Sequence, residues 1–477
     1  MTFLAFADDV VLLGADAREA QHQVNVLIDN IQSLEMNLSI EKSQTFEVVA
    51  KKDTWFIKKP ELKIGDNTIP AVNSDEAFRY LGAKIGPWKG DHCGVIVPEL
   101  LSVVKRVRKL SLKPGQKVEL LVRHICPRYI FHVLVSPPSD TVLKLLDSEV
   151  RQEIKVILHL MPSTATGFFY APKVCGGLGV PIFEHIVKLG ILKCAIKIAS
   201  SIDPAVACLI DEECDKNQWL TPYGSIGQPP WRISRKPKKR LRKEHISQWA
   251  DLRSQGQGVS DLSKSKTGNL CLEEHSLLKP SRFIDAPRLR TNTFGTRSVL
   301  ARADKDIDVM CRRCRAQPET LGHILGLCQY TKGLRIKRHD EVKFLLAERL
   351  RKQNKNEVFV EPTIKAGGSL YKLDLVVKNG EGVLVVDVTV RYENKDHLAK
   401  AEKEIIDKYR PCLRALKELF NASGGEILPL VLGSRGAITP NTERVLKRLG
   451  IAEKDVKTSL LNVLRSPIEL CNIFMNE

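Results

Sequence analysis

The chain has 477 residues, of which 43% are hydrophobic, and its 74 Lys and Arg outnumber 56 Asp and Glu to give a formal net charge of +18. That charge favours a polyanionic partner, most simply nucleic acid. No run of about 18 apolar residues is present and the N-terminus has no basic start, so we expect neither a membrane span nor a signal peptide. The length predicts two to four domains, and the scattered cysteines indicate a reducing compartment.

The first residues predict a small hairpin that carries two acids. Residues 3–13 form two apolar strands around Ala7, Asp8 and Asp9. Adjacent carboxylates at the tip of a tight hairpin suit a two-metal phosphoryl-transfer site, although a plain turn uses the same residues. An amphipathic helix is predicted over residues 16–36, then a strand over 45–49 and a short hairpin that opens at 78–82.

A helical block and a basic stretch follow. Residues 95–201 are predicted to be helical, with an apolar stripe that indicates core packing. Residues 224–243 are predicted to be a linker whose basic run contacts phosphate, acts as a nuclear-import signal or is simply solvated. Residues 288–304 mix arginines with Phe294, which suits a surface that binds a nucleic-acid backbone.

Three cysteines and a histidine then occur in a compact order. The spacing is Cys-x2-Cys-x8-His-x4-Cys, formed by Cys311, Cys314, His323 and Cys328. Three thiolates and one imidazole make a closed tetrahedral zinc site of the structural kind, and the alternative is a set of ordinary buried thiols. Because basic residues flank the cluster, we expect it to face nucleic acid. These residues are Arg312, Arg313, Arg315 and Lys332.

The most informative stretch is residues 371–393. It predicts two Leu- and Val-rich strands, 373–377 and 383–390, joined by an Asn-Gly turn. Each strand contains an acid, Asp374 or Asp387, among residues that are otherwise core. Burying a carboxylate among valines is unfavourable unless something compensates, and a divalent metal compensates both. The pair therefore predicts a metal-dependent phosphodiester-cleaving site, with a solvated hairpin as the alternative.

Taken in order, these motifs resemble a known family. Phe6 to Asp9, residues 38–43 and Tyr80-Leu81-Gly82 resemble three successive palm motifs of the reverse transcriptases of non-LTR retrotransposons. The spacing of the Cys/His cluster resembles the zinc knuckle that precedes the restriction-like endonuclease of target-site-specific members. The elements predicted after residue 338 (helix, strand, hairpin, helix, strand, helix) resemble the core of that endonuclease.

The endonuclease resemblance implies a catalytic lysine as well as the two acids. In simpler nucleases of this fold the lysine lies two residues after the second acid, where this chain has Thr389. In the family it lies on the next helix near a Lys-Tyr pair, so Lys403 and the pair Lys408-Tyr409 are the candidates. Leu373 stands where the family has a proline before the first acid.

The resemblance implies a multidomain α+β and α/β protein. Its predicted parts are a partial reverse-transcriptase palm (1–92), a helical thumb region (93–222), a basic linker (223–305), a zinc knuckle (306–335) and a restriction-endonuclease-like domain (336–477). It implies target-primed reverse transcription, in which a DNA nick primes copying of element RNA. The expected cofactors are Mg²⁺ or Mn²⁺ at Asp8, Asp9, Asp374 and Asp387, and Zn²⁺ at the knuckle. The expected partners are target DNA and element RNA. Synthesis is expected in the cytoplasm and action in the nucleus.

Two other readings stay open from the sequence: a decayed, catalytically inactive copy of such an element, or a non-enzymatic nucleic-acid-binding module. The family's palm has another metal-binding Asp on a strand upstream of the Asp8-Asp9 hairpin, and this chain begins at that hairpin. It therefore looks like the C-terminal part of a longer polyprotein. We expect no RNA-templated DNA synthesis from it alone.

Overall fold

The computed structural model describes residues 2–87, 93–207, 230–265, 267–353, 355–380 and 382–476. The chain divides into two compact units. The first comprises Met1–Val104, Ile125–Asp147 and Phe183–Cys194, and the second comprises Lys105–His124, Ser148–Ile182 and Ala195–Glu477. The beginning of the predicted linker and Glu381 of the predicted turn lie outside the described residues.

The first unit begins with the predicted hairpin. Strands β1 (Thr2–Phe6) and β2 (Asp9–Leu13) are antiparallel, with Phe6 opposite Asp9. The remaining elements of this region are helix α1 (Ala17–Gln32) and the hairpins β3–β4 (Glu47–Lys51, Thr54–Lys58), β5–β6 (Lys63–Ile64, Asn67–Thr68) and β7–β8 (Phe78–Tyr80, Ala83–Ile85). The predicted elements of this region are confirmed, with bounds that shift by a few residues.

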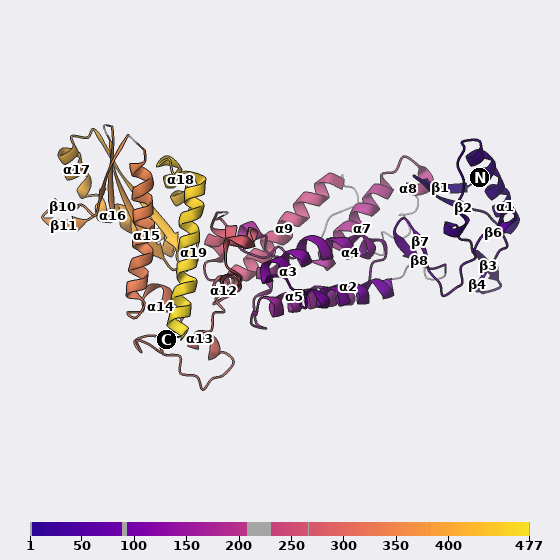
Figure 1. Ribbon diagram of the computed structural model, residues 1–477, viewed down its shortest axis with the longest axis horizontal. Coiled ribbons are helices and arrows are strands. Elements are labelled where there is room, and N and C mark those ends of the chain that lie inside the picture. The colour runs from indigo at the N-terminus through magenta and orange to yellow at the C-terminus, as the bar shows by residue number, and fades with distance from the viewer. Residues whose placement is uncertain are drawn as a thin grey trace. The chain divides into compact units, whose positions relative to one another are not determined.

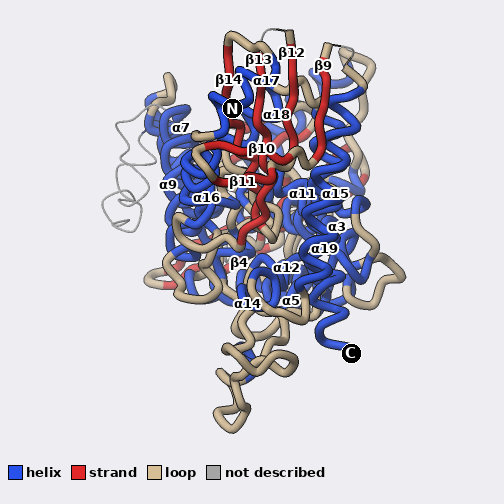
Figure 2. Tube along the Cα trace, turned by 90° about the vertical axis from the view of Figure 1, so that its left-hand side faces the viewer, coloured by secondary structure: helices blue, strands red, loops and turns tan. Residues whose placement is uncertain are grey.

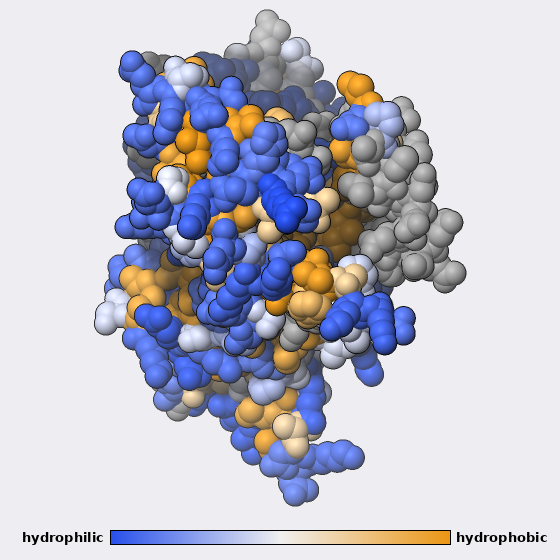
Figure 3. Space-filling view, turned by 90° about the vertical axis from the view of Figure 1, so that its right-hand side faces the viewer, coloured by the Kyte–Doolittle hydropathy of each residue, from blue (hydrophilic) through white to orange (hydrophobic). Residues whose placement is uncertain are grey.

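Helix α1 begins where the sequence favours it. The Asp16 side chain accepts a hydrogen bond from the Glu19 backbone N–H at 2.8 Å, and the Glu19 carboxylate accepts one from Ala15 N–H at 2.7 Å. The helix packs Val24 against Leu62 and Ile69. This core is small, and the apolar side chains of β1 are more than half exposed. Apolar atoms accordingly reach the surface in the space-filling view of this end (Figure 3).

The predicted helical block is confirmed. Its helices are α2 (Cys93–Val107), α3 (Pro114–Leu120), α4 (Cys126–Val135), α5 (Asp140–Ile157), α6 (Thr166–Tyr170), α7 (Phe183–Ala199) and α8 (Pro204–Ala207). The stripe recognised in the sequence is buried, since Leu146, Val150 and Ile154 of α5 are at most 1% exposed. No helix among the described residues combines the length and apolarity needed to cross a membrane.

The stretch predicted to be a linker is helical from Pro230. It forms helix α9 (Pro230–Ala250), and Trp249 near its C-terminal end is buried. The Trp249 ring packs edge-on against Phe168 with centroids 5.5 Å apart, and its Nε1–H donates to the Gln255 carbonyl at 2.9 Å. The described basic side chains of the run, from Lys239 to Lys243, are exposed, and their role stays a prediction.

Short helices continue the second unit: α10 (Val259–Leu262), α11 (Leu270–Glu273), α12 (Pro280–Arg290), α13 (Arg297–Leu300) and α14 (Leu321–Gly326). The prediction of a nucleic-acid-binding surface over residues 288–304 is wrong for two of its side chains, whereas Arg302 of the same stretch lines a cleft. Arg290 is 1% exposed and donates to the Gly268 carbonyl, and Phe294 is also buried. These side chains hold the segment together, so they are not available to phosphate.

The C-terminal region is a twisted sheet covered by helices on both faces. Its elements are α15 (Lys332–Arg351), β9 (Asn356–Val360), β10 (Thr363–Ala366), β11 (Ser369–Lys372), β12 (Leu375–Asn379), β13 (Gly382–Arg391), α16 (His397–Tyr409), α17 (Cys412–Phe420), β14 (Gly424–Gly433), α18 (Pro440–Arg448) and α19 (Glu453–Asn476). The strand order is β14-β13-β12-β9, with only β13 and β14 parallel (Figure 2). The predicted order of elements is confirmed, but the small hairpin β10–β11 was missed.

Alternate residues of β13 pack into two different cores. Val386 and Val388 face the core formed with α15 and α18. Val383 and Val385 face the core formed with α16 and α17. Because side chains alternate along a strand, Asp387 projects to the α16 side. On the other face, α15 lies beside α19 (Figure 1).

A fully buried ion pair joins the ends of β13 and β14. Glu393 and Arg435 are both 0% exposed at their side chains, with Oε2 and Nε 3.2 Å apart. The Glu393 carboxylate also accepts the backbone N–H groups of Arg435 and Ala437. Arg435 Nη2 donates in turn to the Gln257 carbonyl at 2.7 Å. The pair therefore fastens the loop after β14 and the segment at residue 257 to the end of β13.

We predict that Glu393→Gln lowers the free energy of unfolding of the second unit by about 3 kcal/mol or more, because it leaves Arg435 charged and unpaired in the interior. Chemical denaturation followed by circular dichroism measures the change. The matched control is Glu418→Gln, which breaks an exposed pair with Arg414 and should change stability by less than about 1 kcal/mol. Equal small effects for both variants would contradict the role given to the buried pair.

Candidate nuclease site and zinc centre

The two acids of the predicted hairpin lie opposite one another. Leu375 pairs with Val386, so Asp374, just before β12, falls across from Asp387 on β13. Both side chains line the same cleft, and the charge of Asp374 acts on Asp387. The Asp374 carboxylate also accepts a hydrogen bond from the Val388 backbone N–H at 2.9 Å, which fixes its orientation. The fold thus brings together the two residues that the sequence paired.

Asp387 is held in an unfavourable environment for a carboxylate. Burial raises its pKa, and the neighbouring Asp374 raises it further, against smaller opposing effects of Tyr409, Lys408 and Thr389. The Thr389 hydroxyl donates to Asp387 Oδ2 at 3.1 Å. Burial and mutual repulsion both disfavour two ionised carboxylates at this place. A divalent cation bound between them would remove the repulsion, so the pair fits a metal site.

His339 of α15 reaches the site from the other face of the sheet. Its Nε2 lies 3.1 Å from Asp374 Oδ2 and its Nδ1 lies 3.1 Å from Asp340 Oδ1. The hydrogen bond to Asp374 is the largest influence and raises the pKa of His339 to about 9. The sequence analysis missed this residue, because nothing in the sequence shows that the first turns of α15 lie beside the β12–β13 hairpin.

A chain of alternating charges continues from His339. Lys343 is almost completely buried and joins Asp340, at 2.8 Å, to Glu361, at 2.5 Å. Glu361 also accepts from Lys372 at 2.6 Å. The backbone N–H of Glu361 donates to the Asp374 carbonyl at 2.9 Å. This network holds the first turns of α15 against the backbone that carries Asp374.

The structure distinguishes the two candidate lysines. Lys408 Nζ donates to the Tyr409 hydroxyl at 2.6 Å, and both residues line the cleft that contains the acids. The buried Tyr409 hydroxyl also donates to the Lys372 carbonyl at 3.3 Å. Lys403 is exposed on α16 and does not line the cleft. The geometry therefore favours Lys408, with Tyr409 as its support.

The acids open into a large cleft within the second unit. It has a volume of about 1580 Å³ and extends from the β14-β13-β12-β9 sheet to the segment around His323. Basic side chains are distributed along its walls: Arg253, Arg302, Lys332, Arg335, Lys372, Arg391 and Lys408. A cleft of this size and charge can hold a nucleic-acid strand, with the acid pair at one end.

The predicted zinc ligands converge. The ligand atoms of Cys311, Cys314, His323 and Cys328 all lie within 4.8 Å of one another. The sulfurs of Cys311 and Cys328 are 3.9 Å apart, too far for a disulfide but about the separation of two thiolates on one tetrahedral zinc. A hydrogen bond from the Ala316 backbone lowers the pKa of the Cys314 thiol and favours the thiolate that binds metal.

Further hydrogen bonds orient the four ligand residues. Thr320 caps α14 by accepting the His323 backbone N–H, and the His323 Nδ1 lies 3.4 Å from Gln317 Oε1, which leaves Nε2 toward the cysteines. Arg335 of α15 donates to the carbonyls of Gly326 and Cys328. The cluster is thus built into the second unit, at the first turn of the helix that supplies His339.

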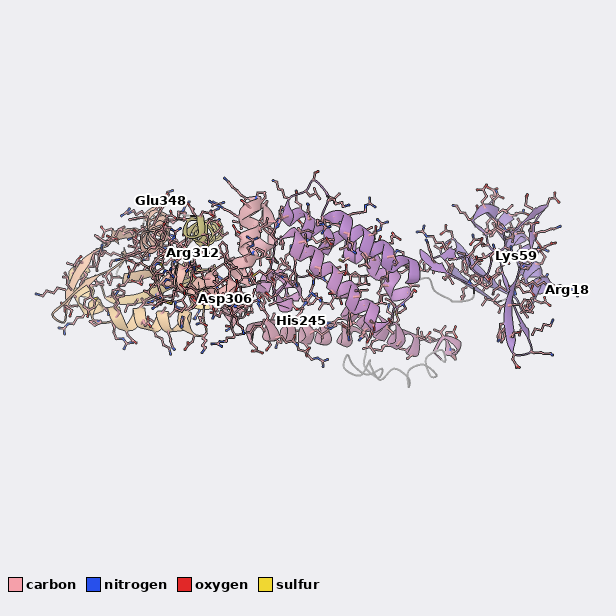
Figure 4. The ribbon with its side chains drawn as sticks, turned by 90° about the horizontal axis from the view of Figure 1, so that it is seen from below. Arg18, Lys59, His245, Asp306, Arg312 and Glu348 are labelled. Atoms are coloured by element: carbon pink, nitrogen blue, oxygen red, sulfur yellow. The ribbon has the colours of Figure 1, made fainter. Side chains whose placement is uncertain are left out.

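Arg312 and Arg313 beside the cluster make contacts within the unit. Arg312 makes hydrogen bonds to the buried Glu319 and lies beside α19 (Figure 4). Arg313 donates to the Phe474 carbonyl and covers the Tyr330 ring. Arg315 is exposed and pairs with Asp308, and Lys332 lines the cleft. That the cluster faces nucleic acid stays a prediction.

Asp8 and Asp9 are both exposed at the turn of the N-terminal hairpin. Ala7 adopts a positive φ of 55°, as a tight turn requires. The side chains point into no cavity that the structure describes, so their role in nucleotidyl transfer stays a prediction.

Several known proteins are similar to this chain along most of its length. No family model matches the chain. A Pol polyprotein from a type-1 R2 retrotransposable element of Popillia japonica is 28% identical over 96% of this chain and 94% of its own length. Those of Nasonia vitripennis and Drosophila melanogaster (type-2 element R2DM) are each 24% identical, over 97% and 99% of this chain. The chain is thus similar in sequence to retrotransposon Pol polyproteins. It spans 44% of the length of the latter two.

We predict that Asp387→Asn raises the thermal midpoint of the metal-free protein at pH 7. The raised pKa means that the ionised Asp387 destabilises the fold above that pKa, whereas the amide carries no charge. The difference between variant and wild type should shrink as the pH falls, because Asp387 is then protonated in both the folded and unfolded states. Differential scanning calorimetry in EDTA at several pH values measures it, and a lower midpoint for the variant at pH 7 would refute the assignment.

Purified, reduced protein should contain about one zinc per chain, bound by the four converging ligands. Cys314→Ser should lose the metal and increase hydrogen exchange around α14, since metal binding and local folding are coupled. Cys194→Ser, at an exposed cysteine outside the cluster, is the matched control and should keep both. Elemental analysis and hydrogen-exchange mass spectrometry give the readouts, and zinc retained by Cys314→Ser would contradict the ligand set.

Proposed function

We propose that the chain is the C-terminal portion of a non-LTR retrotransposon polyprotein and that its second unit is a metal-dependent DNA-nicking endonuclease. The observation that carries the proposal is the facing pair Asp374 and Asp387 at the end of a basic cleft. The homology to R2 Pol polyproteins supports the same reading. The site of action would be nuclear DNA, and the element RNA would be the template of the wider reaction.

The reaction is hydrolysis of a phosphodiester. Water attacks the phosphorus, the bond to the 3′ oxygen breaks, and the products are a 3′ hydroxyl and a 5′ phosphate. Asp374 and Asp387 would hold a divalent cation, which when bound would supply positive charge to acidify water and neutralise the phosphoryl oxygens. The residues of the chain bind that cation, hold the strand and stabilise the charge that develops at phosphorus.

Lys408 is the side chain that we assign to the developing negative charge. Its ammonium lines the cleft beside Asp387, and its hydrogen bond to the Tyr409 hydroxyl holds it in place. A fixed ammonium at this point stabilises the transition state because it needs no reorganisation during the reaction. His339 acts on Asp374: their contact at 3.1 Å orients the carboxylate and offsets its charge until the cation binds.

The N-terminal hairpin is proposed to be a palm element of the polymerase, in which Asp8 and Asp9 hold Mg²⁺ and the incoming nucleotide. The 3′ hydroxyl released by the nuclease would then serve as its primer. We infer target-primed reverse transcription from the pairing of these two activities in one polyprotein.

We predict Mg²⁺- or Mn²⁺-dependent nicking of supercoiled plasmid by the full chain. Asp374→Ala and Asp387→Ala should reduce nicking to background with DNA binding largely intact, since the acids hold the cation and not the strand. Lys408→Ala should slow nicking by about 100-fold, the usual effect of removing one charge-stabilising group. Gel conversion of supercoiled to open-circular plasmid gives the rate.

Lys403→Ala is the matched control on the same helix and should nick at close to the wild-type rate, because its side chain lies outside the cleft. Unchanged nicking in both aspartate variants would refute the nuclease assignment. DNA binding without any nicking by the wild-type protein would favour a decayed copy or a purely nucleic-acid-binding module.

A further inference from the structure

We propose that the outer face of the hairpin β10–β11 is a DNA-binding element that enters a groove of the duplex beside the bond that is cut. The inference rests on the proposed nuclease function and identifies a part of its substrate-binding surface. Neither Lys365 nor Leu370, the residues that carry it, belongs to the motifs recognised in the sequence.

The hairpin has one buried face and one exposed face. Ile364 and Ala366 of β10 are 8% and 7% exposed and pack in the core with α17. On the other face, Lys365 lies directly opposite Leu370, and Thr363 lies opposite Lys372. Opposed residues of an antiparallel pair share a face, so these four side chains form one outward surface. We call it the outer face of the hairpin.

The outer face places a highly exposed apolar side chain next to an exposed lysine. Leu370 is 73% exposed, the largest value for an apolar side chain described in the second unit apart from Ile202. Among the described residues Lys365 has no ion-pair partner, whereas Lys372 pairs with Glu361. An exposed leucine beside an unpaired lysine matches a groove of nucleic acid, where apolar side chains contact sugars and bases while lysine contacts phosphate.

The tip of the hairpin is narrow. Gly367 and Gly368 have φ values of +55° and +80°, as in the tight two-residue turns that favour glycine at both positions. A Cβ built on either residue meets no atom within 4 Å. The tip therefore stands free of the rest of the unit, and Figure 1 shows the hairpin projecting from the nuclease region. A slender two-stranded ribbon of this kind fits a DNA groove.

The position of the hairpin ties it to the site of cleavage. Lys372 ends β11 and lines the cleft, and Asp374 follows two residues later. Leu370 precedes Asp374 by four residues, which span at most roughly 14 Å of extended chain. Groove contacts by Leu370 should therefore lie within about half a helical turn, or about five base pairs, of the nicked bond.

The direct test places a photo-crosslinking amino acid, p-benzoylphenylalanine, at position 370 of the full chain. The matched control carries it at position 419, because Leu419 is also exposed, at 64%, but lies on α17 outside the outer face. The probe is a labelled 40-base-pair duplex, irradiated in EDTA so that no cleavage is needed. We expect a clear DNA crosslink from position 370 and little from 419. Equal yields, or crosslinks from 370 only to a second copy of the protein, would overturn the proposal.

A second measurement uses Lys365→Ala, with Lys355→Ala as the control at another exposed lysine. Loss of one phosphate contact should reduce the slope of log binding constant against log salt by about 1 for Lys365→Ala and leave it unchanged for the control. Identical slopes in the two variants would overturn the role of Lys365. Because both readouts are binding experiments, they stand even if the wild-type protein does not nick, an outcome that would refute the nuclease assignment alone.

Discussion

The buried pair of Glu393 and Arg435 is the interaction on which the C-terminal sheet and its cleft depend. It lies where β13 and β14 end, and it ties in the backbone at residue 257. Burying two charges is favourable only when their remaining polar atoms are satisfied, and here the Glu393 carboxylate receives backbone N–H groups from the opposite loop. The pair therefore constrains the strand that carries Asp387 at the end next to the cleft.

Asp387 shows why such a constraint is needed. Its carboxylate is buried on a strand of valines and faces Asp374, so the metal-free site works against the stability of its own sheet. Surrounding contacts hold the site in place: the Thr389 hydroxyl on Asp387, the Val388 N–H and His339 on Asp374. Functional sites commonly violate the local rules of stability, and the compensation lies in the scaffold around them.

The sequence was sufficient for features that depend on local spacing. The Asn-Gly turn and the alternation of valines placed Asp374 opposite Asp387, and the cysteine spacing located four ligands that converge. Features that depend on tertiary contacts were not accessible. His339 comes from a helix on the other face of the sheet. Lys408 could be distinguished from Lys403 only by knowing which side of α16 lines the cleft. The arginines at 290 and 312 looked like phosphate ligands because charge alone does not reveal a buried carbonyl or carboxylate partner.

The contact between Arg435 and the Gln257 carbonyl joins residues 178 positions apart. Parallel pairing of β13 with β14 adds a second long-range requirement, because β14 follows only after α16 and α17. During synthesis on the ribosome, the earlier segment must wait for the later one before the walls of the cleft are fixed. Nascent chains that stop short of Arg435 would thus present an incomplete cleft, so the proposed nuclease would become competent only after its last strand has been made.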